Sequence, residues 1–370
     1  MNPKRAGACG ETPGPYGRSV QSSFLLPPSA YFDAGWFDRE QQGLFARAWH
    51  IAGAAEDVPA PGDYVTVDAG FDPLIVIRGT DGELRAFHNF CRHRGHKLLE
   101  DSGNSHTGIV CPYHFWNFAT DGALRRVPQE SEFAGVDLTA YGLLPAAVGE
   151  WGGFVFVNGD PNADFAAWLR DFPDRIGSYR PERLGEVAHV QFDASCNWKL
   201  FVENHIDVYH LWYLHAKSLG AYDHNQFEWS QTGPHWVSYE PVREGVERKR
   251  PHVGSRAIEG LDERDRLGIG AHMLFPNMLF ASESEFFMSY IAVPIAADRC
   301  VIDVRIRAEP GADVEMLVAA AKEFMFEDIA ACEGVQATVR SSRFAVGPLA
   351  QRHERPITNF HEELLELLEP

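Results

Sequence analysis

The chain is short of cysteine, of long apolar runs and of basic residues, and each shortage excludes a class of protein. Six cysteines among 370 residues are too few for a disulfide framework, so we expect free thiols or metal ligands. No apolar run reaches the length of a membrane span. The 33 basic residues are outnumbered by 52 acidic ones, and this net charge of −19 disfavours nucleic acid and anionic lipid as partners.

Two sequence signals are absent as well. Met1 to Arg18 contains Lys4 and Arg5 but no apolar core after them, which argues against a signal peptide and favours a loose tail. A cytoplasmic protein is therefore expected. No G-x-G-x-x-G motif opens a βαβ unit, so the chain has no evident site for NADH or flavin.

Apolar residues make up 45% of the chain, enough for two domains, and the pattern of elements changes near residue 160. The first part has helical periodicity over Asp38 to His50, and short apolar or alternating runs follow it. Turn signals at 61–62, 81–82 and 121–122 separate these runs. The pattern predicts a small all-β domain over residues 45–160, with strands at 64–67, 74–77, 84–87, 109–111 and 153–157.

The second part, residues 161–370, has strands and helices in separate blocks. Such blocks indicate an α+β domain built on an antiparallel sheet. Residues 1–44 are expected to form a tail and a helix that packs against this domain. The predicted helices of the second part cover 165–169, 198–215, 313–340 and 360–368, and the predicted strands cover 187–192, 288–293 and 301–306.

Two mixed pairs of Cys and His lie on hairpin tips of the predicted β-domain. Cys91 and His93 have the spacing C-x-H, and Cys111 and His114 have the spacing C-x2-H. Two facing tips can hold a two-iron cluster, with two thiolates on one iron and two imidazoles on the other. Residues that suit tight turns lie beside these ligands: Gly95, Gly108 and Pro112.

A zinc site is the alternative for these four residues. Zinc sites usually pair like with like, as C-x2-C and H-x3-5-H, whereas each arm here has one Cys and one His. The mixed spacing therefore favours a [2Fe–2S] cluster. A further alternative is that the four are unrelated core residues, but they would then have these spacings only by chance.

A second group of metal-binding residue types lies farther along the chain. Asp207, His210 and His215 are on or near one predicted helix, where Asp207 and His210 share a face because they are three residues apart. His215 is five residues beyond His210, so a bend or a helix end is needed to bring it to the same ion. Two imidazoles and one carboxylate form a facial triad that leaves positions free for water, O2 or substrate. A helix with hydrogen-bonded histidines and core aromatics is the alternative.

The segments RAFHNFCRHRGHKL and GIVCPYHFWNFATDGALRRVP resemble the Rieske motif of ring-hydroxylating non-haem iron oxygenases. The resemblance covers nearly the whole chain, from near Phe37 to Leu367. It implies that Cys91 and Cys111 bind one iron of the cluster and that His93 and His114 bind the other. It also implies a Rieske domain followed by a catalytic domain of helix-grip type.

The segment ENHIDVYHLWYLH is similar to the family's mononuclear-iron motif, E-N-x-x-D-x-Y-H-x4-H. The similarity implies that His210 and His215 bind ferrous iron. It also implies that Asp207 is a bridging carboxylate, which connects this iron to the cluster of a neighbouring subunit through His114. His205 matches no ligand of the motif.

The third iron ligand must come from elsewhere in the chain. The segment FEDIAACEGVQ resembles the E-D-x3-C/W-E-x-V-Q helix of the family, and this resemblance implies that Asp328 is the carboxylate ligand. Glu327 is adjacent but points about 100° away on a helix. A solvated acidic helix face is the alternative at this position.

The resemblance implies a terminal oxygenase component of a multicomponent mono- or dioxygenase, assembled as a homotrimer. A reductase, with or without a ferredoxin, would pass electrons from NAD(P)H to the cluster, and the iron would use them to activate O2. A Rieske electron carrier with an inactive second domain is the alternative from another class, and a zinc-stabilised binding module is a third.

The expected substrate is an aromatic or small organic acid, as in aromatic hydrocarbon catabolism. A quaternary amine such as choline or a betaine is the alternative, because aromatic rings can stack on an aryl group or hold a cationic head. The aromatic residues that could line such a pocket are Trp212, Tyr213, Phe227, Trp229, Phe286 and Phe287.

Overall fold

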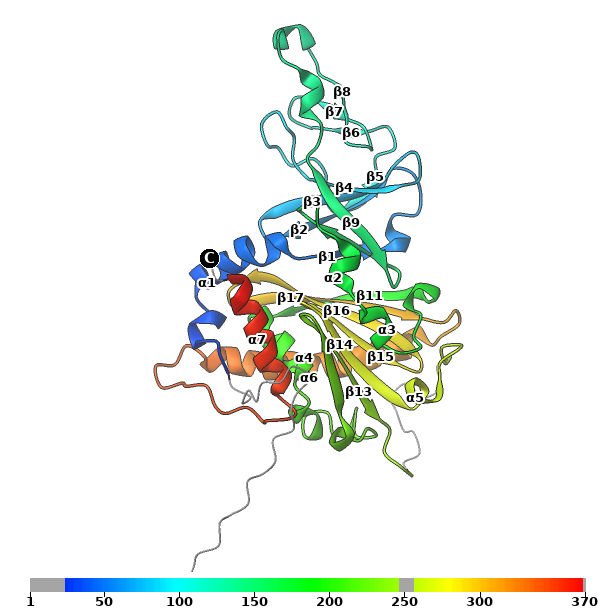
Figure 1. Ribbon diagram of the computed structural model, residues 1–370, viewed down its shortest axis with the longest axis vertical. Coiled ribbons are helices and arrows are strands. Elements are labelled where there is room, and N and C mark those ends of the chain that lie inside the picture. Colours follow the sequence, from blue (N-terminus) through cyan, green and yellow to red (C-terminus); the bar gives the residue numbers. More distant parts are fainter. Residues whose placement is uncertain (1–23, 246–255, 369–370) are drawn as a thin grey trace, which may run out of the picture.

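The chain folds into a β-domain above an α+β domain, as the computed structural model shows (Figure 1). The structure describes residues 24–245 and 256–368, and the expected tail over Met1–Arg18 lies outside them. The predicted α+β class with antiparallel sheets is confirmed. Within the described residues, no helix has the length and apolar character needed to cross a membrane.

Short strands separated by glycine turns form the main sheet of the β-domain. The predicted strands at 64–67, 74–77 and 84–87 are confirmed as antiparallel neighbours. Gly82 turns the chain between the last two with a φ of 87°, a conformation that favours glycine. The strands of this sheet lie in the order β1 (His50–Ala54), β10 (Phe154–Asn158), β9 (Pro145–Trp151), β4 (Leu84–His88), β3 (Asp72–Arg78), β2 (Asp63–Ala69) and β5 (Ser102–Asn104).

A small three-stranded sheet extends the β-domain at its outer end (Figure 1). The strand predicted from residue 109 is confirmed, although it is short and ends before Cys111. Ile109 and Phe118 are buried partners in this sheet and pack with Ile75 and Ile77 of β3, so one apolar core joins the two sheets. The three strands are β6 (Ile109–Val110), β7 (Asn117–Phe118) and β8 (Leu124–Arg126).

A seven-stranded sheet, antiparallel throughout, is the framework of the second domain. Its long strands alternate side chains between two apolar cores, one on each face. The strand order is β11 (Gly185–Ala194), β17 (Arg299–Ala308), β16 (Phe286–Ala296), β15 (Met278–Glu283), β14 (Gly268–Leu274), β13 (His235–Pro241) and β12 (Glu228–Thr232).

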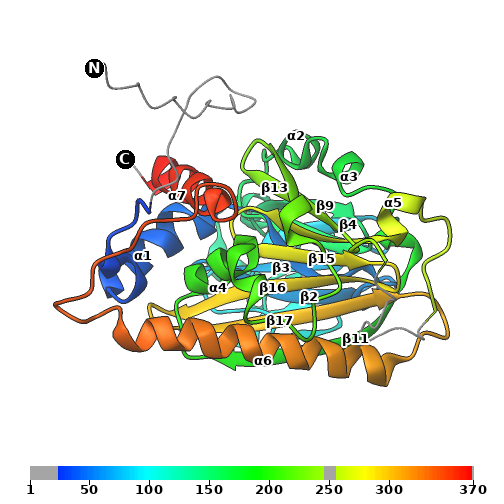
Figure 2. The same ribbon diagram turned by 90° about the horizontal axis from the view of Figure 1, so that it is seen from below.

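Helices cover one face of this sheet, and the longest of them, α6, runs along it beside α4 (Figure 2). Their apolar residues form the larger core with the sheet. The helices on this face are α1 (Ala34–Gly43), α4 (Trp198–Ile206), α6 (Val314–Thr338) and α7 (Arg355–Leu368). The short helices α2 (Phe165–Leu169) and α3 (Phe172–Arg175) pack in the smaller core on the other face, and α5 (Glu263–Arg266) precedes β14. Short 3-10 segments within the described residues are η1 (Pro28–Tyr31), η2 (Phe45–Arg47), η3 (Ala55–Asp57), η4 (Glu130–Phe133), η5 (Leu138–Tyr141), η6 (Pro181–Arg183), η7 (Tyr209–Trp212) and η8 (His224–Gln226).

Polar caps fix where the main helices begin. The Asn197 side chain accepts a hydrogen bond from the backbone of Lys199 at the start of α4, and Asp313 accepts one from Met316 at the start of α6. These side chains satisfy N–H groups that have no partner inside the helix. Both helices therefore begin at the residues that the sequence predicts.

Three predicted helices have different limits in the structure, and the last of them, expected over 360–368, begins at Arg355. The helix expected over Asp38 to His50 begins earlier, at Ala34, because Asp33 caps it, and it ends at Gly43. The helix expected over 198–215 ends at Ile206, and a 3-10 turn follows it. The domain boundaries predicted at residues 44 and 160 stay a prediction.

The first helix is fixed to the second domain by a buried ion pair. The Glu40 carboxylate accepts hydrogen bonds from Lys199 Nζ at 2.6 Å and from Trp198 Nε1 at 2.9 Å. All three side chains are buried, so each charge depends on the other for its solvation. This pair holds the first turn of α4 against α1.

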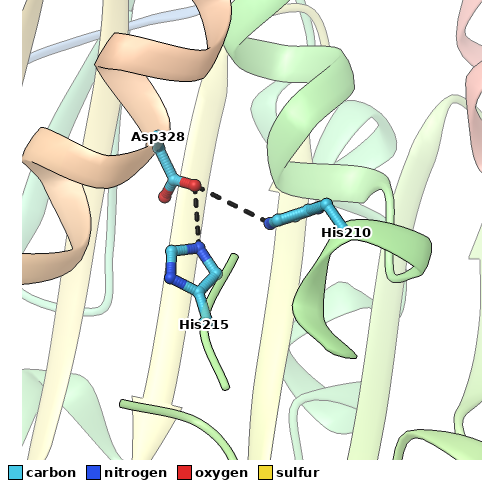
Figure 3. A group of neighbouring side chains, drawn as sticks. All are labelled: His210, His215 and Asp328. Carbon is cyan, nitrogen blue, oxygen red and sulfur yellow. Dashed lines mark hydrogen bonds and ion pairs between the residues drawn. The ribbon is translucent and has the colours of Figure 1, made fainter. Parts of the chain in front are cut away.

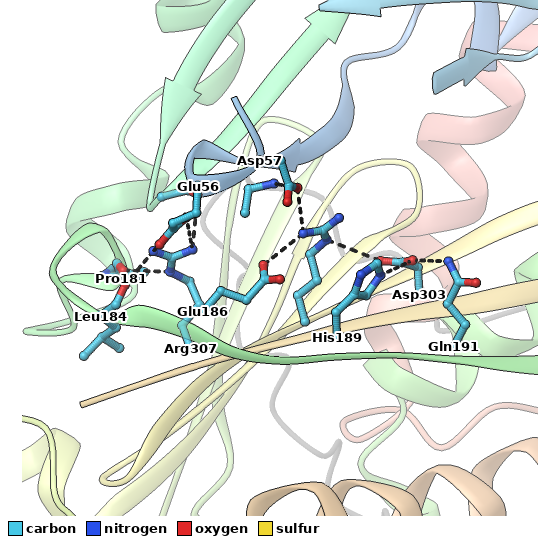
Figure 4. A network of polar contacts seen from close by, with 12 residues as sticks. Glu56, Asp57, Pro181, Leu184, Glu186, His189, Gln191, Asp303 and Arg307 are labelled. Carbon is cyan, nitrogen blue, oxygen red and sulfur yellow. Dashed lines mark hydrogen bonds and ion pairs between the residues drawn. The ribbon is translucent and has the colours of Figure 1, made fainter. Parts of the chain in front are cut away.

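A buried arginine on β17 joins the two domains (Figure 4). Arg307 donates hydrogen bonds to the carboxylate of Glu56, at 2.7 Å, and to the carbonyl oxygens of Pro181, Leu184 and Gly153. Glu56 lies in η3 of the β-domain, and Gly153 directly precedes β10. The guanidinium therefore spans the boundary between the two sheets.

A second arginine on the same strand extends this network (Figure 4). Arg305 donates to Asp57 of the β-domain at 3.0 Å and to Glu186 of β11 at 2.9 Å. His189 is hydrogen-bonded to Asp303 at 2.7 Å, and this bond raises the pKa of the imidazole above its ordinary value. Opposite charges thus alternate along the interface.

Candidate metal centres

Two loops of the β-domain share one backbone pattern. In each loop the cysteine N–H donates to the carbonyl oxygen five residues later, and the fourth residue after the cysteine donates to the cysteine carbonyl. The partners of Cys91 are His96 and Gly95, and those of Cys111 are Trp116 and Phe115. The fourth residue has a positive φ in both loops, 72° at Gly95 and 58° at Phe115. The two cysteine-histidine arms are therefore presented by equivalent turns.

The four predicted cluster ligands meet between these loops. Cys91 and Cys111 are 2% and 1% exposed, and their thiol groups are within hydrogen-bonding reach of each other. The rings of His93 and His114 lie 4.5 Å apart between centroids. The two sulfurs thus form one pair and the two imidazoles another, the division that a two-iron cluster needs.

The environment of these side chains fits a metal-bound group. Nδ1 of His93 is buried and has no hydrogen-bond partner in the described part of the chain, while the ring stacks on Trp116 at 5.0 Å. Burial raises the pKa of the Cys91 thiol, and desolvation together with His114 lowers the pKa of His93. A buried thiolate requires a positive charge beside it, and a bound iron provides that charge.

The geometry also bears on the zinc alternative. Zinc sites usually pair like ligands within each arm, whereas here the two sulfurs form one pair and the two imidazoles another. This division suits a two-iron cluster.

The second centre begins where α4 ends. Asp207 has an extended backbone, and its carboxylate accepts the N–H of Tyr209 at 2.5 Å. The next N–H, of Val208, donates to the carbonyl of His353, far along the chain. These bonds replace helical ones, so the chain turns and carries His210 and His215 on separate turns.

His210, His215 and Asp328 converge on one point (Figure 3). Nε2 of His215 lies 2.8 Å from Asp328 Oδ1, and Nε2 of His210 lies 3.7 Å from the same oxygen. Asp328 reaches this point from the middle of α6. Two imidazoles and a carboxylate on one side of an ion match the facial arrangement that binds ferrous iron.

Carboxylates hold the outer nitrogens of both histidines. Asp207 Oδ2 lies 3.3 Å from Nδ1 of His210, and Glu327 Oε2 accepts a hydrogen bond from Nδ1 of His215 at 2.8 Å. Burial lowers the pKa of His215, but its bonds to Asp328 and Glu327 outweigh this effect and raise the pKa. Such partners direct Nε2 toward a metal. Sequence reasoning missed this contact of Glu327, because the angle along the helix placed it away from the site.

His205, which matches no ligand of the motif, lies outside the triad. Its Nε2 is 3.1 Å from the carbonyl oxygen of His272 on β14. Burial lowers its pKa to about 4, so the imidazole is neutral. It lines the pocket described next and occupies the side of α4 that faces the sheet.

A pocket lies beside the triad, between the sheet and the two helices α4 and α6. Leu317, Ala321, Phe324 and Asp328 recur at helical spacing along one face of α6 and form one wall. Of the six aromatic residues considered for the lining, only Phe286 borders the pocket. Tyr213 is exposed, and the other four belong to cores or to neighbouring contacts: Trp212, Phe227, Trp229 and Phe287.

Acidic side chains border the pocket. Tyr290 on β16 has a pKa well above its ordinary value because of burial and of the charges on Asp328 and Glu283. Glu283 is 1% exposed and Glu240, another lining residue, is 4% exposed. Buried carboxylates therefore lie in a wall that is otherwise largely apolar.

Two family profiles match the chain. The Rieske [2Fe-2S] domain matches residues 48–142, and the ring hydroxylating alpha subunit (catalytic domain) matches residues 181–369. A solved quaternary ammonium Rieske monooxygenase in complex with substrate L-carnitine has the same fold, with a TM-score of 0.78 and 24% identity over 94% of this chain and 97% of that chain.

Curated relatives agree with these profiles. The glycine betaine monooxygenase oxygenase subunit of Pseudomonas aeruginosa (strain UCBPP-PA14) is 36% identical over 197 residues, which are 52% of this chain and 45% of the relative. Choline monooxygenase, chloroplastic, of Beta vulgaris is 28% identical over 360 residues, 93% of this chain and 77% of the relative. The chain spans about half the length of the first of these relatives.

The family profiles confirm the expected pair of cofactors, a [2Fe–2S] cluster in the first domain and a mononuclear iron in the second. The two groups of side chains described above lie in the two matched regions, one in each. The chain therefore belongs to the ring-hydroxylating alpha subunits, the family of Rieske-type non-haem iron oxygenases.

Proposed function

We propose that the chain is the terminal oxygenase component of a multicomponent monooxygenase. Electrons enter at a cluster held by Cys91, Cys111, His93 and His114. The acceptor is an iron whose ligands are His210, His215 and Asp328. The single observation that carries this proposal is the convergence of these last three side chains within 4.8 Å beside a pocket, because an electron carrier would have no use for it.

The chemistry of the bound groups sets what the polypeptide must do. A ferrous iron held by His210, His215 and Asp328 would supply O2 activation, and a monooxygenation would consume two electrons and two protons, place one oxygen atom in a C–H bond and release the other as water. The chain holds the two imidazoles in one tautomer through Asp207 and Glu327. Its apolar pocket keeps the substrate beside the iron and limits access of water.

Asp207 acts as the connector between two metal sites on different subunits. Its carboxylate lies against His210, and it is still partly exposed, as are its neighbours Tyr209 and Tyr213. A second imidazole, His114 of a neighbouring subunit, can therefore reach its outer side. This arrangement requires an oligomer, and a homotrimer places each cluster beside the iron of the next subunit.

A separate reductase, with or without a ferredoxin, feeds the cluster. The sequence contains no G-x-G-x-x-G motif that would bind NAD(P)H, which supports a separate reductase. Tyr113 and Phe115 at the cluster loops are exposed, 49% and 64%, and an exposed rim suits electron transfer from a partner.

The substrate is a quaternary amine. The pocket has the buried carboxylate of Glu283 and the rings of Phe286 and Phe324 in its wall, groups that suit a trimethylammonium head. The relatives are named for glycine betaine, choline and carnitine. They do not support the preference for an aromatic or organic acid, nor a role in aromatic hydrocarbon catabolism.

Two measurements test this function. Purified protein should contain two irons and two acid-labile sulfides per cluster, plus one further iron, as expected from the ligand sets. Stoichiometric zinc without sulfide would contradict the cluster. With a surrogate reductase, glycine betaine or choline should drive O2 uptake that equals amine consumed, whereas benzoate and 3,3-dimethylbutanol, a neutral copy of choline, should not. Faster coupled turnover of benzoate would contradict the substrate class.

A further inference from the structure

A buried histidine in the pocket has one nitrogen without a partner. His224, in η8, is 1% exposed and borders the same pocket as the triad. Its Nδ1 forms a short hydrogen bond with the carboxylate of Glu240 on β13. Its Nε2 is buried and meets no hydrogen-bonding atom of the described residues. Buried polar atoms nearly always have partners, so Nε2 is the atom to explain.

Glu240 determines how the imidazole meets a ligand. A carboxylate in this setting accepts, so the proton of the pair lies on Nδ1 and Nε2 faces away from Glu240. Glu240 is itself 4% exposed, and Trp212 packs edge-on against the imidazole ring at 5.4 Å. These contacts fix the ring plane of a residue that borders the pocket, and Nε2 is the atom of the ring left without a partner among the described residues.

Two other polar groups of the pocket differ from His224 in the hydrogen bonds that they can form. Glu283 and Asp328 are carboxylates, and both act on Tyr290 through their negative charge. Neither carboxylate can donate a hydrogen bond to an oxygen of the substrate. His224 differs, because an imidazole nitrogen can accept a hydrogen bond from a hydroxyl or, when it carries a hydrogen, donate one to a carboxylate.

We infer that His224, held by Glu240, binds the oxygen-bearing end of the substrate. The inference rests on the proposed function and narrows its substrate class: a quaternary amine with a carboxylate or hydroxyl oxygen on a short chain, rather than a simple tetraalkylammonium ion. Glycine betaine and choline present these two oxygens, and tetramethylammonium presents none.

The test compares binding of these three ions to the holoprotein by titration calorimetry. His224→Gln should weaken glycine betaine or choline roughly 10- to 100-fold, the value of a lost charge-assisted hydrogen bond. Tetramethylammonium should change by about twofold or less, since it makes no such bond. Glu240→Gln, which keeps the shape of the pair, should cause the same selective loss to a smaller degree.

His235→Gln is the matched control. His235 is also a fully buried histidine, but it bonds the Trp168 carbonyl and does not border the pocket, so selectivity should stay at the wild-type ratio. Equal weakening of all three ions by His224→Gln and Glu240→Gln, or no weakening, would overturn the inference alone. A wild-type protein that binds none of the three ions would overturn the proposed substrate class and the inference with it.

Discussion

Replacing Arg307 with Met should destabilise the protein and make the two domains unfold at different urea concentrations. The guanidinium is 2% exposed and donates to three carbonyl oxygens, of Pro181, Leu184 and Gly153, as well as to Glu56. Methionine keeps the apolar stem but leaves the carbonyls without this donor, at about 1–1.5 kcal/mol each. The ion pair adds less than about 1 kcal/mol, because the Glu56 side chain is 48% exposed. We expect a loss of about 4 kcal/mol in the free energy of unfolding.

The assay follows urea unfolding with two signals, visible absorption of the cluster and tryptophan fluorescence. The two transitions should coincide in the wild type and move apart in Arg307→Met, because the lost bonds cross the domain boundary. Glu56→Gln is the control and should cost less than about 1 kcal/mol. Equal costs for the two variants, or a cost below about 1 kcal/mol for Arg307→Met, would refute this account.

Four further predictions concern the metal centres and pH. His210→Ala should abolish turnover and leave the absorption spectrum of the cluster unchanged; normal product formation would refute the ligand assignment. Asp207→Asn should load both metals but slow reoxidation of the reduced cluster by O2 with substrate in single-turnover experiments. Glu327→Gln should weaken iron binding about 10- to 100-fold by equilibrium dialysis, and less than loss of Asp328 does. His189 has a raised pKa, so its contribution to stability is complete below about pH 6.5 and is lost as pH rises through that raised value; His189→Gln should flatten this decline in melting temperature.

The sequence was informative where local rules decide the structure. Gly82 and its aspartate neighbour mark a hairpin, and the strands on either side were predicted to within one or two residues. Cap residues explain the starts of α4 and α6, and the missed cap, Asp33, explains why α1 begins four residues earlier than predicted.

The features that the sequence did not predict depend on contacts between distant segments of the chain. The spacing of His210 and His215 required a bend or a helix end but did not place it at Asp207, because the chain leaves the helix through a bond to His353. Asp328 was assigned through resemblance, because an acidic residue on a helix has no local mark of metal binding. The pair of His224 and Glu240 has no spacing signature either, and only the folded sheet brings it to the pocket.

The end of α4 has a consequence for how the iron site assembles. Residues 207–222 are held by single turns and by a few bonds to other segments, whereas Asp328 belongs to a long continuous helix. Amide protons in the first segment should therefore exchange with solvent faster than those around Asp328. Iron joins the two, so loading should slow exchange over 207–222 and leave α6 nearly unchanged. Hydrogen–deuterium exchange would then report iron occupancy residue by residue, without substrate, reductase or turnover.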